Sequence, residues 1–286
     1  MPNPAPFNRS LLRLRRDRAA RQFHTADFLK REMAERLAER LDDITRDFPL
    51  ALDLGCHGGE LGEALMSKHK IGILIHADLS PTMLMRAAGP RLAASEEALP
   101  FGDNTFDAVF SCMSLHWVND LPGTLAQIRR ILKPDGLFLA SFPGGESLKE
   151  LRAACFKAGV AGSGVSPRVS PFVDVRDAGM LLQRAGFALP VVDADTLCVS
   201  YPSALELMRD LRLMGETNAL NAQRRSFMGK DELSCILSLY QEEYADAEDR
   251  VPASFEIVTL TAWKQHESQQ QPAKRGSGQV SLKDVL

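Results

Sequence analysis

Two patterns of apolar and polar residues recur along the chain, one with the spacing of a helix and one of short apolar runs. In residues 27–44, apolar side chains recur at three- and four-residue steps, which predicts a helix with one buried stripe. Helical patterns also separate a series of short apolar runs that are typical of buried strands, at residues 50–54, 71–77, 106–111 and 137–142. Strands that alternate with helices predict a mostly parallel sheet covered on both faces, so the first half is expected to be a doubly wound α/β unit.

The second half is mostly helical in pattern. Two late strands are expected, and the helical stretch between them, residues 204–244, is interpreted as an insertion that could cover a site. The expected elements are helices at 148–158 and 174–185, a Gly- and Ser-rich break at 159–166, and strands at 190–201 and 254–264. The final residues, rich in Gln, Ser, Gly and Lys, are expected to form a flexible tail.

Composition and charge change this picture little. The 286 residues are 45% hydrophobic and 25% charged, as in an ordinary soluble protein, and the net charge of −3 argues against a nucleic-acid binder. The five cysteines form no CxxC pair, so no zinc site or disulfide framework is predicted. No apolar run is long enough for an integral membrane segment. The arginine-rich start is interpreted as part of the mature chain and as a solvated helix face.

A glycine-containing turn follows the first predicted strand, in the sequence LDLGCHGG at residues 52–59. Such a turn lets the backbone approach a ligand at a helix N-terminus. Asp53, at the strand end, would repel a pyrophosphate but attract the ammonium and sulfonium groups of S-adenosylmethionine (SAM). The spacing also differs from the dinucleotide pattern G-x-G-x-x-G, so SAM is favoured over NAD.

Two further segments complete the predicted cofactor site. Asp78, at the end of the second strand, is placed to accept hydrogen bonds from both ribose hydroxyls, and residues 95–101 (SEEALPF) lie where an adenine edge would be read. The cofactor-binding residues predicted from these motifs are Asp53, Gly55, Cys56, Gly59, Asp78, Leu79, Ser95, Glu96, Glu97 and Ser111. No metal ligands are predicted.

These motifs resemble the class I SAM-dependent methyltransferase superfamily, strongly over residues 27–145. That resemblance implies a Rossmann-like fold with a seven-stranded, mostly parallel sheet whose last strand is antiparallel, and a helical insertion before that strand. Five further motifs resemble a narrower family, the arginine hydroxylase and respiratory complex I assembly factor five group. They are SCMSLHWVNDL (111–121), GESLKEL (145–151), VSPF (169–172), LMGETN (213–218) and HESQQQPAKRGS (266–277).

Two positions depart from these family patterns. His57 stands where the pattern has a second glycine, and a histidine that needs positive φ or crowds the methionine part of SAM would weaken binding. Ser95 stands where the superfamily usually has an aspartate that accepts from the adenine amino group. A serine accepts more weakly.

Catalytic residues are not identified uniquely. His116 and Trp117 follow the fourth strand, near where the methyl group would point, and are candidates for taking a proton and for lining the substrate pocket; packing in a loop under the lid explains them equally well. A non-haem iron oxygenase would need two histidines and one carboxylate on adjacent elements. The six histidines show no such pattern.

The expected organisation has four segments: an N-terminal helical segment (1–48), a SAM-binding core (49–145), a C-terminal part with a helical lid (146–264) and a flexible tail (265–286). The narrower resemblance implies arginine hydroxylation in an iron-sulfur subunit of respiratory complex I, the expected protein partner. It implies SAM as the cofactor and a bacterial cytoplasmic location, or the mitochondrial matrix in a eukaryote. The alternatives are methyl transfer of the malonyl-carrier-protein type and a non-catalytic assembly chaperone.

Overall fold

The computed structural model describes residues 5–161, 168–170, 174–222 and 229–270. The chain forms one seven-stranded sheet in the order β3-β2-β1-β4-β5-β7-β6. The strands are β1 (Phe48–Leu54), β2 (Ile71–Asp78), β3 (Arg91–Ala93), β4 (Phe106–Cys112), β5 (Leu132–Pro143), β6 (Phe187–Tyr201) and β7 (Val251–Lys264). β7 pairs antiparallel with both of its neighbours, and the pairs among β1 to β5 are parallel. The predicted methyltransferase-type sheet is therefore confirmed.

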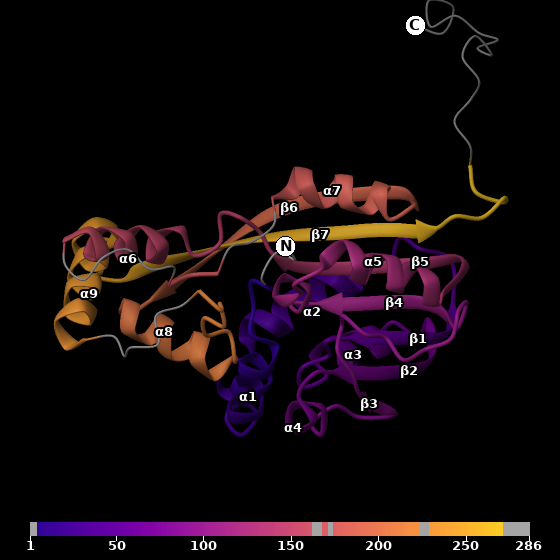
Figure 1. The fold of residues 1–286 in the computed structure, drawn as a ribbon, viewed down its shortest axis with the longest axis horizontal. Coiled ribbons are helices and arrows are strands. Elements are labelled where there is room, and N and C mark those ends of the chain that lie inside the picture. Colours follow the sequence, from indigo (N-terminus) through magenta and orange to yellow (C-terminus); the bar gives the residue numbers. More distant parts are fainter. Residues whose placement is uncertain (1–4, 162–167, 171–173, 223–228, 271–286) are drawn as a thin grey trace, which may run out of the picture.

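Helices cover both faces of this sheet (Figure 1). They are α1 (Arg9–Ala19), α2 (Phe28–Glu39), α3 (Glu60–Ser67), α4 (Pro81–Leu84), α5 (Leu121–Ile131), α6 (Lys149–Ala161), α7 (Val175–Arg184), α8 (Ala204–Leu213) and α9 (Lys230–Tyr244), with short 3-10 turns η1 (Phe23–Thr25) and η2 (Leu115–Trp117). Among the residues described, none of these helices is both long and apolar enough to cross a membrane.

Consecutive strand residues belong to opposite cores, as the two-residue period of a strand requires. Phe110 packs with α2 and α3 on one face, and Val109 packs with α5 and α7 on the other. Leu139 and Phe138 divide in the same way. Because side chains on both faces of the central strands are buried, these strands have the nearly continuous apolar sequences from which they were predicted.

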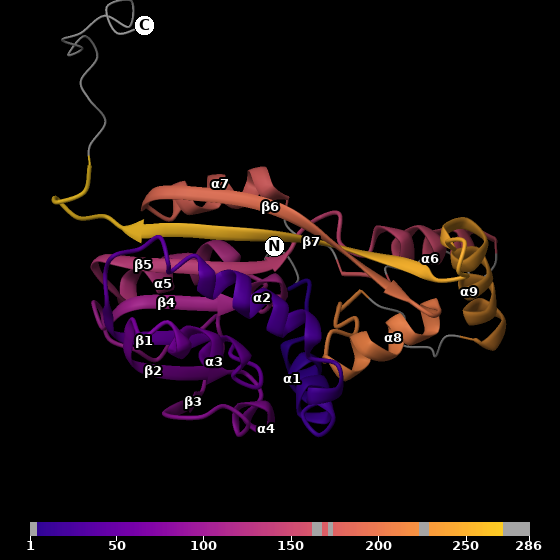
Figure 2. The same cartoon turned by 180° about the vertical axis from the view of Figure 1, so that it is seen from behind.

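The paired strands β6 and β7 extend past the rest of the sheet. β5 contacts β7 only from Ile257 to Trp263, whereas β6 follows β7 back to Val251. The extended end carries α6, α8 and α9 as a second lobe, beside α1 and away from β1 to β3 (Figures 1 and 2). The predicted helical insertion is thus α8 and α9, with residues 223–228 between them outside the described part.

Three details of the sequence-based interpretation were wrong or incomplete. The short edge strand β3 was not expected, because its three residues are exposed and carry no apolar run. The predicted break began at Gly159, but α6 continues to Ala161. The arginine-rich start is not simply a solvated face, because Arg16 in α1 is only 1% exposed. Residues 271–286 of the predicted tail lie outside the described residues.

Candidate functional site

The turn between β1 and α3 has the backbone conformation that its glycines permit. Gly55 and Gly59 have φ values of +71° and +96°, and His57 between them has a φ of +50°. A left-handed conformation costs a residue with a Cβ about 1–2 kcal/mol, which explains why the family pattern has glycine at the position of His57. The backbone N–H of His57 donates to Asp78 Oδ2 at 3.1 Å, so the turn is tied to the end of β2.

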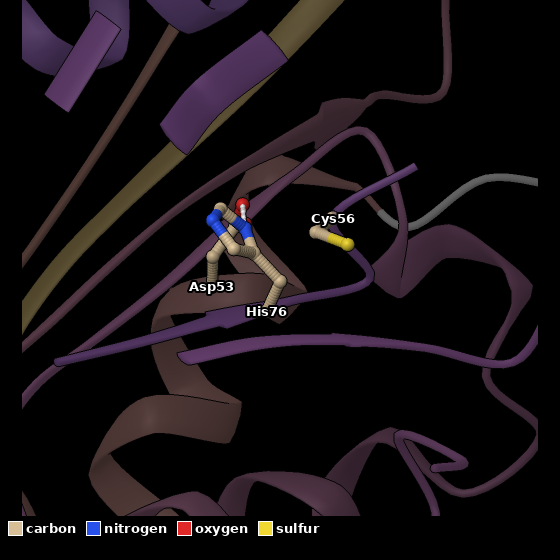
Figure 3. A group of neighbouring side chains, drawn as sticks. All are labelled: Asp53, Cys56 and His76. Carbon is tan, nitrogen blue, oxygen red and sulfur yellow. Dashed lines mark hydrogen bonds and ion pairs between the residues drawn. The ribbon is translucent and has the colours of Figure 1, made fainter. Parts of the chain in front are cut away.

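Asp53, Cys56 and His76 lie together beneath this turn (Figure 3). Their potential ligand atoms are all within 4.8 Å of one another, and all three residues are buried. His76 Nδ1 is 3.0 Å from Asp53 Oδ2. Burial raises the pKa of the Cys56 thiol well above its usual value, and the charges of Asp53 and Asp78 raise it further. The three side chains thus form a histidine–carboxylate pair beside a buried thiol.

Asp78 is fully buried at the end of β2 and meets a guanidinium from the N-terminal helix. Its carboxylate accepts from the backbone N–H of Ser80 at 2.7 Å, and Arg16 Nη1 lies 3.3 Å from Oδ2. Burial raises the pKa of Asp78, and the charge of Arg16 opposes that effect. The carboxylate predicted to hold ribose hydroxyls therefore already contacts a cation of the same chain.

Glu96 is held by the same helix. Arg9 forms an ion pair with Glu96 Oε2, and Arg16 Nη1 lies 3.5 Å from Oε1, which also accepts from Ser114 Oγ at 2.7 Å. Burial alone would raise the pKa of Glu96, but the two arginines lower it to about 2. Glu96 Oε1 and Ser114 Oγ also lie beside Gly55, where an added Cβ would be 3.3 Å and 2.1 Å from them.

The other predicted cofactor residues occupy several environments. Ser95 Oγ lies 3.3 Å from Arg9 Nη2, and Glu97 accepts from the backbone N–H of Asn119. Ser111 donates to the carbonyl of Leu54 at 2.8 Å and so joins two strands. Leu79 packs beside Trp117. The predicted residues do gather at the carboxyl ends of β1, β2 and β4, but their cofactor roles remain predictions.

His116 and Trp117, in η2 after β4, share a carboxylate that was not predicted. Glu216 Oε2 accepts from Trp117 Nε1 at 2.6 Å and lies 3.1 Å from His116 Nε2. Glu216 Oε1 accepts from Lys30 Nζ at 2.7 Å, and Lys30 also contacts the His57 ring at 3.0 Å. Burial alone would raise the pKa of Glu216, but Lys30 and His116 hold it well below the usual value. Glu216 is therefore an ionised carboxylate.

This network borders a cavity of about 1080 Å³ between α1 and the second lobe. Lys30, His116, Trp117 and Glu216 are among its lining residues, whereas Asp53, Gly55, Asp78 and Glu96 are not. The two candidate catalytic residues therefore border this cavity, and these four predicted cofactor residues lie outside its lining.

Sequence reasoning missed Arg9, Arg16, Lys30 and Glu216. A usable signal was present for two of them. Lys30 stands three residues before Met33 on the apolar stripe of α2, and Arg16 stands four residues after the buried Leu12 of α1. A charged residue on an apolar helix face requires a buried partner, although the sequence does not identify that partner.

Comparison with known proteins gives a consistent family. A methyltransferase domain family model matches residues 52–140. The human protein arginine-hydroxylase NDUFAF5, mitochondrial, is 44% identical over 98% of this chain and 83% of its own length. A malonyl-[acyl-carrier protein] O-methyltransferase from Methylovorus sp. (strain MP688) is 34% identical over 87% of this chain and 86% of its length.

A solved SAM-dependent methyltransferase from Thermotoga maritima has the same fold, with a TM-score of 0.53 and 16% sequence identity. The match covers 89% of this chain and 100% of the Thermotoga chain. The 44% identity to human NDUFAF5 over 98% of the chain identifies the family far more specifically than the shared fold does. This chain belongs to the arginine-hydroxylase NDUFAF5 family of methyltransferase-like enzymes.

Proposed function

We propose that the chain binds SAM at the β1–α3 turn and acts on an arginine side chain of a protein, by hydroxylation, in an iron-sulfur subunit of respiratory complex I. The family resemblance supports the reaction and the partner, and it favours the bacterial cytoplasm or the mitochondrial matrix as the location. The structural observation that carries the proposal is Glu216, an ionised carboxylate bordering a large cavity beside the predicted cofactor site.

Glu216 has the chemistry to hold a substrate guanidinium. Carboxylates bind arginine through charge-assisted hydrogen bonds, and Glu216 lines the cavity together with Trp117. The indole N–H and His116 orient Glu216, and Lys30 balances its charge when the cavity is empty. An incoming guanidinium would take the place of the Lys30 ammonium at Oε1.

The carboxylates at the predicted cofactor site suit SAM in part. Asp53 Oδ1 is buried and has no hydrogen-bond partner among the described residues, so it can accept from the ammonium group of a ligand. Asp78 suits ribose hydroxyls only after Arg16 has left its carboxylate. Binding therefore includes an exchange of Arg16 for the ribose. When bound, SAM supplies a methyl group on a sulfonium, which makes that methyl electrophilic.

Methyl transfer to a carboxylate is the second candidate. It is favoured by the 34% identity to a malonyl-[acyl-carrier protein] O-methyltransferase over 87% of the chain. A carboxylate acceptor needs no general base, which agrees with a site in which His116 is already engaged by Glu216. A non-catalytic assembly chaperone, with the cofactor site kept closed by Arg16, is the third.

Calorimetric titration with SAM and its demethylated product tests the cofactor. Binding to the wild type is expected, with a large loss in Asp78→Asn and no change in Asp103→Asn, a control that alters an exposed carboxylate. Absence of binding would eliminate both enzymatic candidates and leave the chaperone. Mass spectrometry of the isolated subunit after incubation with SAM, dioxygen and an electron donor then separates the reactions. Hydroxylation adds one oxygen atom from dioxygen while the donor reduces the other to water, and methyl transfer replaces one hydrogen with the methyl group of SAM.

A further inference from the structure

The cavity beside Glu216 has two walls. One is formed by α1, the turn after it and the start of α2, and the other by α8, the segment after α8 and the loop that follows β5. Figures 1 and 2 show α1 and α8 facing each other from the two lobes. The cavity is therefore bordered by elements that lie far apart in the sequence.

Positive side chains line both walls. Whereas the whole chain has a net charge of −3, the cavity lining includes six cationic side chains and one carboxylate. The cations are Arg15, Arg18, Arg21, Lys30, Arg168 and Arg212, and the carboxylate is Glu216. A concentration of one sign of charge at a concave site attracts ligands of the opposite sign.

Internal partners do not cancel this charge. Lys30 pairs with Glu216 at 2.7 Å, and Arg168 pairs with Glu232 at 2.5 Å. Arg18, Arg21 and Arg212 form no salt bridge with any described residue. Three guanidinium groups around the cavity thus lack an anionic partner within the described chain.

The charged form of Arg15 is disfavoured by this arrangement of cations. Its guanidinium is half-buried and donates to the carbonyl of Thr217 at 2.8 Å, not to a carboxylate. Burial lowers the pKa of Arg15, and the nearby charge of Arg18 lowers it further. Like charges brought together at a partly desolvated site favour an anionic ligand between them.

We propose that the cavity binds an acidic stretch of a polypeptide, the segment that flanks the modified side chain of the protein substrate. This inference rests on the proposed function and states which feature of the protein substrate the cavity would recognise. A carboxylate at the inner end would receive the target side chain, and guanidinium groups on the walls would receive aspartates and glutamates on either side of it. At about 1080 Å³ the cavity is at the upper end of the range of about 300–1,000 Å³ that is usual for ligand sites, so it has room for several residues of a peptide.

Apolar lining residues favour a polypeptide over a nucleic acid. Leu11, Met208, Leu211 and Phe255 line the cavity between its charged groups. A peptide presents apolar side chains and carboxylates together, whereas a phosphate backbone would meet Glu216 as a like charge.

Fluorescence anisotropy with a synthetic peptide provides the test. The probe has a central arginine flanked by aspartates, and the comparison peptide has asparagines in place of the aspartates. Wild-type protein is expected to bind the aspartate peptide about fivefold more tightly or better, because each ion pair contributes modestly. That preference should fall as salt is raised.

Two double variants locate the binding site. Arg18→Gln with Arg212→Gln removes one cation from each wall, and Arg13→Gln with Arg209→Gln removes the same charge from the same helices outside the cavity lining. Only the first variant should lose the preference for aspartate. Equal binding of both peptides, an equal loss in both variants, or stronger binding of a single-stranded oligonucleotide would overturn the proposal.

The outcomes also separate this inference from the proposed function. If the aspartate peptide binds in the cavity but gains neither oxygen nor methyl when SAM and the remaining reactants are supplied, docking is supported and the reaction is not. If both peptides are modified with the same kcat/KM, the reaction is supported and docking is overturned.

Discussion

Arg16 Nη1 lies 3.3 Å from Asp78 Oδ2, although the two residues are 62 positions apart in the sequence, with α2, β1 and α3 between them. Both side chains are almost completely inaccessible to solvent. Burial alone would lower the pKa of Arg16, but Asp78 and Glu96 raise it, so the guanidinium keeps its charge. The N-terminal helix thus supplies the cation that makes two buried carboxylates tolerable.

Replacing this cation should have two opposite effects. In Arg16→Gln the free energy of unfolding is expected to fall by about 3 kcal/mol, because Asp78 remains buried without a counter-charge and Glu96 keeps only Arg9. SAM affinity is expected to rise about tenfold, because the ribose no longer competes with a guanidinium. Denaturant titration and calorimetry measure the two effects, with Arg13→Gln as the control on the same helix. Weaker SAM binding would show that Arg16 contacts the cofactor instead.

Glu216 and Lys30 should be coupled in stability. Glu216→Gln leaves the Lys30 ammonium buried without its carboxylate and should cost about 3 kcal/mol. Adding Lys30→Met removes the stranded charge and should restore most of the loss, which a double-mutant cycle measures. The exposed pair of Glu206 and Arg209 is the control, and its loss should cost less than about 0.5 kcal/mol. If the effects of Glu216→Gln and Lys30→Met on the free energy of unfolding simply add, the predicted coupling is wrong.

Acid should destabilise the protein through His57. Burial lowers the pKa of His57 well below its usual 6.5, and the charges of Lys30 and Arg16 lower it further. The unfolded chain takes up a proton near pH 6.5 that the native state does not, so the free energy of unfolding falls as the pH drops below that value. His57→Asn, which tolerates the positive φ, should remove about 2 kcal/mol of the loss between about pH 7 and pH 5. The exposed His266→Asn should leave the pH profile unchanged.

Gly59 should not accept a side chain. Its φ is +96°, and an added Cβ would lie 2.9 Å from Ala87 Cα, a backbone atom that cannot rotate away. Gly59→Ala is expected to cost about 2 kcal/mol or more, from left-handed strain and this contact. At Gly145 an added Cβ meets no atom within 4 Å, so Gly145→Ala is a matched control. Thermal unfolding compares the two, and an equal effect would argue against the close approach at Gly59.

The sequence predicted the features that depend on neighbouring residues. Runs such as Leu50–Leu54 became β1 because a central parallel strand is buried on both faces, and Gly55 and Gly59 adopted the positive φ values that the motif required. It did not predict contacts between distant segments. Nothing near Glu216 in the chain indicates that it meets Lys30, 186 positions away, and the family resemblance alone identified its LMGETN segment as important.

Charged residues were the most difficult to interpret. An arginine on a helix is usually solvated, so Arg16 could not be distinguished from Arg13 by residue type. The apolar stripe of α1 distinguishes them, because Arg16 lies on it with Leu12 and Ala19, whereas Arg13 is exposed. A charged residue on the apolar stripe of a helix is therefore as useful a sign of a functional site as a glycine turn.

The extended pairing of β6 with β7 has an evolutionary consequence. The second lobe is carried on the part of β6 and β7 that extends past β5, whereas the glycine turn follows β1, at the other side of β4 and β5. Mutations on the cavity side of α8, at Met208 or Arg212 for example, can therefore reshape one cavity wall without altering the strands that position the turn. Such a layout lets relatives that share one scaffold differ in the molecules they modify while the strands that hold the glycine turn stay the same.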